Sequence, residues 1–132
     1  MSGYLTITAH LKKNSKIKIE VASFSRNSDI YTAFNDSGIR YAYPDGKTPP
    51  SEMKEEDFDQ VLNDLKESIE NSRKRLSDYE IYVKDKPEYV EDITELKEYL
   101  EEQIRTESSI QILKEILYDE YNDLKNIEAS MS

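Results

Sequence analysis

The feature that most constrains the fold is a stripe of apolar side chains that recurs alternately every four and three residues in the second half of the chain. This period of 3.5 residues is typical of an α-helix that packs against another helix along one seam. A strand would divide the same residues between two faces, because its side chains alternate. The pattern predicts one long helix from about residue 51 or 54 to about residue 83. The stripe, with one polar member at Ser72, consists of Phe58, Leu62, Leu65, Ile69, Ser72, Leu76, Tyr79 and Val83.

A second stripe of the same kind follows a short reversal at Pro87. Since two long amphipathic helices joined by a short loop are antiparallel neighbours, we expect a coiled-coil-like helical hairpin. No Gly or Pro occurs after Pro87, so residues 87–128 are predicted to be helical, either as one helix or as two helices that meet near residues 106–109. The last turns are expected to cover the sheet of the head. The second stripe consists of Tyr89, Ile93, Leu96, Leu100, Ile104, Ile110, Leu113, Leu117, Tyr121 and Leu124.

The spacing of apolar residues is different in the first 24 residues. There apolar and polar side chains alternate on both sides of a short polar segment. Period two is typical of strands with one buried face, so residues 4–24 are predicted to form a β-hairpin. Pairing residues of the same face opposes Ala9 to Ile19 and Ile7 to Val21. The alternating apolar residues are Leu5, Ile7, Ala9, Leu11, Ile17, Ile19 and Val21.

The segment after the hairpin contains the signals of a short helix. Ser28 is a suitable N-cap, the helix is expected to continue through Asp36, and Gly38 is placed to end it. Residues 39–43 are predicted to form a third strand, and residues 44–50 a turn-rich connector. The expected fold is therefore α+β, with a small antiparallel sheet and short helix in residues 1–50. Residues 51–132 form the helical hairpin, packed with the head as one domain.

The net charge of −10 is unevenly distributed, because residues 1–50 carry a charge of +3 and residues 51–132 a charge of −13. An acidic surface repels the phosphates of nucleic acids, so direct nucleic-acid binding is not expected. Such a surface favours a basic protein partner, although charge that merely maintains solubility is the simpler interpretation. The chain has no cysteine, no apolar run that could span a membrane and no secretory leader at its start, which predicts a cytoplasmic protein.

The chain contains no recognisable catalytic motif. His10 is the only histidine and lies on the polar side of a predicted strand, so neither a metal site nor a Ser-His-Asp triad is expected. Glycine-rich phosphate-binding loops are absent. Adjacent carboxylates on a helix point in different directions and do not form a catalytic pair. We therefore predict no catalytic residue, metal or cofactor, and a protein that is not an enzyme.

One polar segment in the head is a candidate ligand site. The N-terminus of a helix binds anions through its free N–H groups, so Arg26, Asn27 and Ser28 form a possible phosphate site. Arg40 is a further ligand for the same anion, and Tyr41 a surface on which a base stacks. Capping and turn chemistry is the alternative interpretation of these residues.

The tip of the predicted hairpin is a candidate partner-binding surface. Tyr82 and Tyr89 flank the reversal, and tyrosine is common where a surface is half buried in an interface. Arg73 and Arg75 form a small basic island in the first long helix. Ordinary packing and ion pairs within the helix are the alternative interpretations.

In its general style the chain resembles small accessory proteins of bacteriophages and mobile elements, which combine a compact α+β head with an acidic helical hairpin. We expect a non-enzymatic protein-interaction module, that is an inhibitor, adaptor or regulator. A homodimer or higher oligomer is expected, because exposed heptad edges pair with one another. The alternative is an oligomeric protein that binds or sequesters a nucleotide or another small anion, such as an anti-defence protein.

Overall fold

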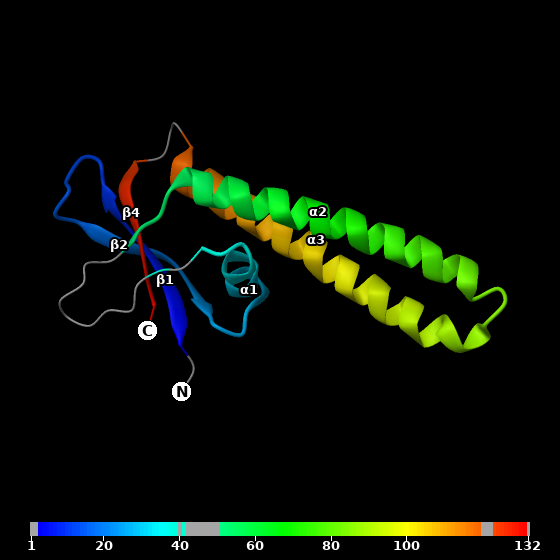
Figure 1. Cartoon of the computed structure of the whole chain (residues 1–132). Helices are drawn as coiled ribbons and strands as arrows, with labels where there is room; N and C mark the ends of the chain where they lie inside the picture. The colour runs from blue at the N-terminus through cyan, green and yellow to red at the C-terminus, as the bar shows by residue number, and fades with distance from the viewer. Residues whose placement is uncertain (1–2, 40, 42–50, 120–122, 132) are drawn as a thin grey trace.

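The computed structural model describes residues 3–39, 41, 51–119 and 123–131. It has the expected α+β architecture, a four-stranded antiparallel sheet with a short helix and a long helical hairpin. Figure 1 shows the hairpin extending far beyond the sheet, so the molecule consists of a head and a protruding arm. We call the hairpin the arm, its sheet-proximal end the base and its opposite end the tip.

Both ends of the described chain contribute the central strands of the sheet. The strands are β1 (Tyr4–Leu11), β2 (Lys18–Ser25), β3 (Ser51–Glu52) and β4 (Leu124–Met131), in the order β2-β1-β4-β3. The prediction of helix through Leu124 is therefore wrong. Leu124 fits the helical spacing, but Ile127, Ala129 and Met131 are buried at every second position, which is the period of a strand.

The register of the β1–β2 hairpin is confirmed near its turn and shifted farther away. Ala9 pairs with Ile19 as predicted, whereas Ile7 pairs with Ala22 instead of Val21. A β-bulge after Glu20 inserts one extra residue into β2, which alternation alone does not reveal. A second bulge interrupts the pairing of β1 with β4, where Asn126 adopts a φ of 50°.

The short helix α1 (Asp29–Asp36) is confirmed with the predicted N-cap. The Ser28 hydroxyl accepts a hydrogen bond from the Tyr31 N–H at 3.2 Å. Gly38 follows the helix with a φ of +78°, a left-handed conformation that glycine adopts without strain. The predicted third strand is not formed at Ile39 and Tyr41, which lie outside the strands, and residues 40, 42 and 43 lie outside the described residues.

The arm consists of α2 (Glu55–Tyr82), a 3₁₀ turn η1 (Pro87–Tyr89) and α3 (Val90–Tyr118). The predicted antiparallel hairpin is confirmed, and α3 continues through residues 106–109 without a break. A helix of 28 residues is about 42 Å long at the usual rise per residue. None of the helices in the described parts of the chain is long and apolar enough to cross a bilayer.

The hydrophobic core lies where the base of the arm and α1 cover one face of the sheet. Its centre is an aromatic cluster in which Phe58 packs edge-on against Phe34 of α1 and Tyr118 of α3, with ring centroids 5.2 and 5.5 Å apart. Leu5 and Ile7 of β1 are buried beneath it. The same packing holds α1 beside the arm, and this placement creates the groove described next.

Candidate functional site

A groove of about 380 Å³ lies where α1 meets the arm. Binding pockets for small ligands typically begin at about 300 Å³, so this groove lies at the lower end of that size range. Its walls come from three helices, with α1 on one side and α2 and α3 of the arm on the other. The lining residues are Asp29, Thr32, Ala33, Asp36, Ser37, Asp64, Leu65, Glu67, Ser68, Asn71, Tyr99, Glu102, Gln103 and Thr106.

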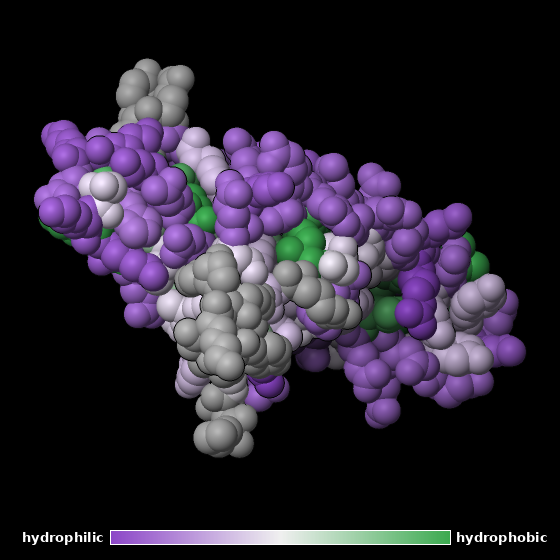
Figure 2. Space-filling model, turned by 60° about the vertical axis from the view of Figure 1, so that its left-hand side comes forward, coloured by the Kyte–Doolittle hydropathy of each residue, from purple (hydrophilic) through white to green (hydrophobic). Residues whose placement is uncertain are grey.

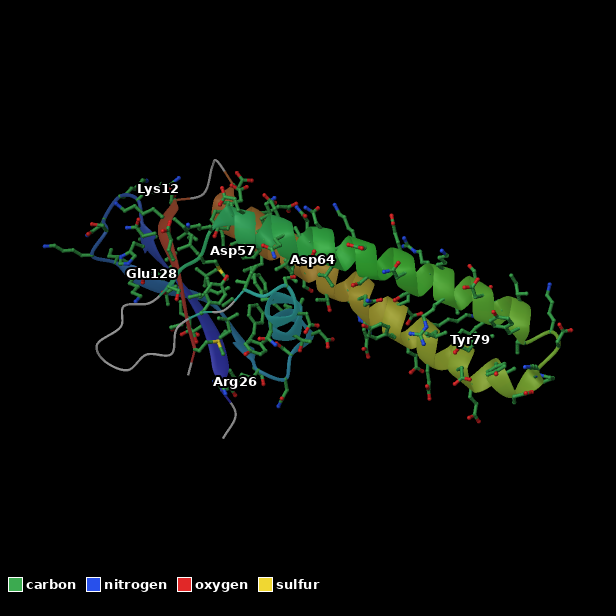
Figure 3. All side chains as sticks on the ribbon, viewed as in Figure 1. Lys12, Arg26, Asp57, Asp64, Tyr79 and Glu128 are labelled. Carbon is green, nitrogen blue, oxygen red and sulfur yellow. The ribbon has the colours of Figure 1, made fainter. Side chains whose placement is uncertain are left out.

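The charged residues that line the groove are all acidic. Five of its lining residues are Asp or Glu, and none of the described lining residues is Lys, Arg or His. Figure 3 places Asp64 on the arm beside α1. Five carboxylates around one groove make a local negative potential that attracts a cation and repels an anion. We call this surface the acidic groove.

The floor of the acidic groove is polar and well ordered. Gln103 is only 7% exposed, and its Oε1 accepts a hydrogen bond of 2.6 Å from the Ser72 hydroxyl. The buried Thr106 hydroxyl donates to the Glu102 carbonyl at 2.9 Å. These bonds satisfy polar groups inside the arm, because an unpaired buried group is costly. The bond between Ser72 and Gln103 also links α2 to α3 beneath the groove.

The position of α1 is fixed at both ends. At its start, Ser28 caps the helix and donates a hydrogen bond of 2.7 Å to the Ser25 carbonyl. At its end, the Gln60 side-chain amide of α2 donates to the Ser37 carbonyl at 2.8 Å. The groove therefore has preformed walls, which reduces the entropy that a ligand must lose on binding.

A second hollow of about 450 Å³ lies at the junction of the arm and the sheet. Its lining carries both signs of charge, since Lys12, Lys54 and Lys125 alternate with carboxylates. Figure 3 shows Lys12 at the sheet end of this junction. Because a mixed lining neutralises its own charge, this hollow has no comparable preference for a cation or an anion.

Two tyrosines near the junction are held in their neutral form. Burial, followed by the charge of Asp57, raises the pKa of Tyr118, whose hydroxyl donates to the Met53 carbonyl at 2.7 Å. The same two causes raise the pKa of Tyr41. The Tyr41 hydroxyl lies beside Asp57 but makes no hydrogen bond of regular geometry with a described residue. A tyrosine with a raised pKa is a poor general base at neutral pH.

The residues of the predicted anion site take up capping and core roles. Ser28 is the N-cap, and the Asn27 N–H donates to the Ser25 hydroxyl at 3.2 Å. Arg26 is partly buried at the end of β2, and its backbone N–H donates to the Gly3 carbonyl at 3.0 Å. Tyr41 packs its ring against Phe34, 6.4 Å between centroids.

Among the described residues, the hollow that Tyr41 lines includes none of Arg26, Asn27 and Ser28. Tyr41 lines a hollow with residues that include Leu5 of β1 and Phe34 of α1. The acidic groove is a separate hollow, which includes Asp29 but not the neighbouring Ser28. Arg40 lies outside the described residues.

The residues of the predicted partner surface lie on the distal half of the arm. Tyr82 is 56% exposed, whereas Tyr89 is half buried against Tyr79, with ring centroids 5.6 Å apart. Arg73 is exposed, and Arg75 lines a small hollow with Tyr79 and residues of α3. The tip therefore presents Tyr82 to solvent and uses Tyr89 to close the hairpin (Figure 3 labels Tyr79).

Sequence reasoning missed the acidic groove. From the sequence alone, the charge of residues 51–132 indicates a surface that maintains solubility, and residues 28–36 indicate only a short capped helix. Residues 29, 32, 33 and 36 do share one side of α1, which is a signal that the sequence contains. Which side of the arm faces α1 depends on the tertiary packing.

The carboxylates of the acidic groove do not form a metal site. Among the described residues, no group of three or more His, Cys, Asp or Glu side chains is arranged to hold a metal ion. Comparison with protein-family models, curated proteins and solved structures found no match to the chain. The function is therefore inferred from the geometry and charge of the site.

Proposed function

We propose that this protein is a non-catalytic interaction module, acting as an inhibitor, adaptor or regulator, that binds a basic segment of a partner protein in the acidic groove. The supporting observation is the preformed groove between α1 and the arm, with five carboxylates and no described lining cation. Complementary charge increases the rate of encounter and selects among partners. We place this interaction in the cytoplasm. The chain has no cysteine, so its fold needs no disulfide bond and no oxidising compartment.

The chemistry of the lining favours lysine or arginine side chains. Carboxylates accept hydrogen bonds from an ammonium or, in pairs, from a guanidinium. Ala33 and Leu65 offer apolar surface for the methylene stem of such a side chain. Tyr99, which is exposed on the wall of the groove, provides a ring for a cation–π contact.

The most direct test measures the binding of a short fluorescent arginine-rich peptide by anisotropy at low and moderate salt. The double substitution Asp64→Lys with Glu67→Lys reverses two charges of the groove and is expected to weaken binding at least about tenfold. The matched control, Glu70→Lys with Asp78→Lys, changes the net charge equally at exposed positions of α2 outside the groove. It is expected to weaken binding only about twofold, through the long-range field.

Two results would contradict the proposal. If the two double variants weaken binding equally, the peptide responds to the overall charge of the arm and has no site in the groove. If the wild-type protein does not bind the peptide at low salt, the groove is not a receptor for cations.

The nucleotide-binding hypothesis predicts a different result. A thermal-shift screen with inorganic phosphate and mononucleotides is expected to give no stabilisation, because the acidic groove repels anions. A shift that disappears in Arg26→Ala would favour the anion site at the end of β2 instead.

A further inference from the structure

Strand β2 forms one edge of the sheet and is much longer than the strand at the other edge. It spans eight residues, whereas β3 spans two. Within the described parts of the chain, no strand pairs with β2 on the side away from β1. A long edge strand presents unpaired N–H and C=O groups and is a template for pairing with a further strand.

The backbone of β2 indicates which residues are available for such pairing. The Leu11 N–H donates to the Ile17 carbonyl at 3.1 Å, so residue 17 directs its backbone towards β1. In an antiparallel ladder this direction alternates, so residue 19 also points towards β1 and residues 18 and 20 point outwards. Lys18 and Glu20 thus offer their backbone groups at the edge.

The side chains of the same segment are unusually apolar for a free edge. Ile17 and Ile19 are 45% and 37% exposed, although Ile19 shares its face with the fully buried Ala9. The other half of β2 is packed against the core, where Phe24 pairs with Leu5. At this end of β2 the apolar face of the sheet therefore extends beyond the area that α1 and the base of the arm cover.

We propose that a second copy of this chain pairs with β2 in an antiparallel arrangement centred on Ile19. A two-fold axis at Ile19 opposes Lys18 of each copy to Glu20 of the other, so both outward-facing pairs exchange backbone hydrogen bonds and carry opposite charges. The two Ile19 side chains meet at the axis and shield each other. An interface of this kind uses the same patch on both copies, as two-fold symmetry requires.

Other features agree with this register. Lys18 lies 3.5 Å from Glu128 of its own chain, so the incoming Glu20 joins an existing polar cluster on the outer face of the sheet. The bulge after Glu20 ends the regular ladder, which limits the interface to a short segment. Figure 1 shows the β1–β2 turn at the end of the molecule opposite the tip of the arm, so pairing there leaves the arm accessible.

The outer face of α3 is the competing surface for a second copy. Ile104, Ile112 and Ile116 are exposed there. However, α3 carries eight Asp or Glu and only three Lys or Arg, so two such helices side by side repel each other. The charges around Ile19 are instead self-complementary. This favours pairing through the sheet.

The test is analytical ultracentrifugation of the full chain over a range of concentrations. The wild-type protein is expected to form dimers, and Ile19→Lys to weaken dimerisation at least about tenfold, because it places two ammonium groups at the axis. Ile112→Lys is the control at a similarly exposed isoleucine and is expected to leave the dimer unchanged. Circular dichroism checks that each variant is folded.

A pair of charge variants tests the register itself. Glu20→Lys alone opposes lysine to lysine, and Lys18→Glu alone opposes glutamate to glutamate, so each variant is expected to be monomeric. Their equimolar mixture restores opposite charges in both pairs and is expected to form a heterodimer. A wild-type protein that stays monomeric, a dimer that dissociates with Ile112→Lys but not with Ile19→Lys, or a mixture that remains monomeric would overturn the proposal.

Discussion

At the base of the arm the stripe residues Phe58 and Leu62 are buried, whereas towards the tip the stripe residues Leu76 and Tyr79 are only half buried. Both regions belong to one continuous helix, α2, and the apolar repeat runs through both. Figure 2 shows a mostly hydrophilic surface along the arm, with apolar side chains visible only in separate small areas. The difference is therefore one of packing and not of sequence pattern.

The difference shows what a pair of helices achieves by itself. At the tip, the seam residues Leu76, Tyr79 and Leu96 are only half buried, because two helices cover each other along a narrow strip. At the base, α1 and the sheet add a further layer, which completes the burial. The change coincides with the buried pair of Ser72 and Gln103.

The largest effect that would sharpen this comparison is expected for Phe58→Ala. Removing a fully buried phenylalanine from the base should lower the free energy of unfolding by about 3–5 kcal/mol, through lost burial and the remaining cavity. Leu96→Ala in the half-buried seam of the tip is expected to cost about 1–2 kcal/mol. Urea unfolding measures both. Equal losses would show that the tip is packed as tightly as the base.

A smaller effect is expected at the boundary between the two regions. Ser72→Ala leaves the buried Gln103 oxygen without its donor and should cost about 1–3 kcal/mol. The double substitution Ser72→Ala with Gln103→Leu removes both polar partners and is expected to recover most of that loss. Thermal unfolding of Ser72→Ala, Gln103→Leu and the double variant completes a double-mutant cycle. Additive losses would mean that the hydrogen bond does not couple the two helices.

The smallest effect concerns pH and again separates the base from the tip. The raised pKa of Tyr118 means that folding favours its neutral hydroxyl, so this contribution is complete below about pH 10 and is lost as the pH rises further. Tyr118→Phe should cost about 1 kcal/mol at neutral pH, from the lost bond to Met53, and reduce the alkaline loss of stability.

The control for this prediction is Tyr82→Phe at the exposed tip. It is expected to leave both the stability at neutral pH and its alkaline dependence unchanged. Urea unfolding between pH 8 and about pH 11 compares the variants across the ordinary pKa of tyrosine. An unchanged alkaline slope in Tyr118→Phe would mean that its hydroxyl ionises as readily in the folded protein as in the unfolded chain.

The sequence by itself determined the elements whose signals are local. The 3.5-residue repeat and Pro87 indicated the antiparallel arm, and Ser28 indicated the start of α1. Alternation predicted the pairing of Ala9 with Ile19. In each case the residues that carry the signal lie close together in the chain, so their spacing alone reports which face is buried.

Only the tertiary structure decided how these elements combine. The pairing of β4 with β1 joins residues more than 100 positions apart, and Leu124 fits both helical and strand spacing, so its state depends on whether β1 is available as a partner. The acidic groove likewise exists only because the core packs α1 against one side of the arm. Periodicity shows that a face is buried, but the element that covers it is chosen by packing across the whole chain.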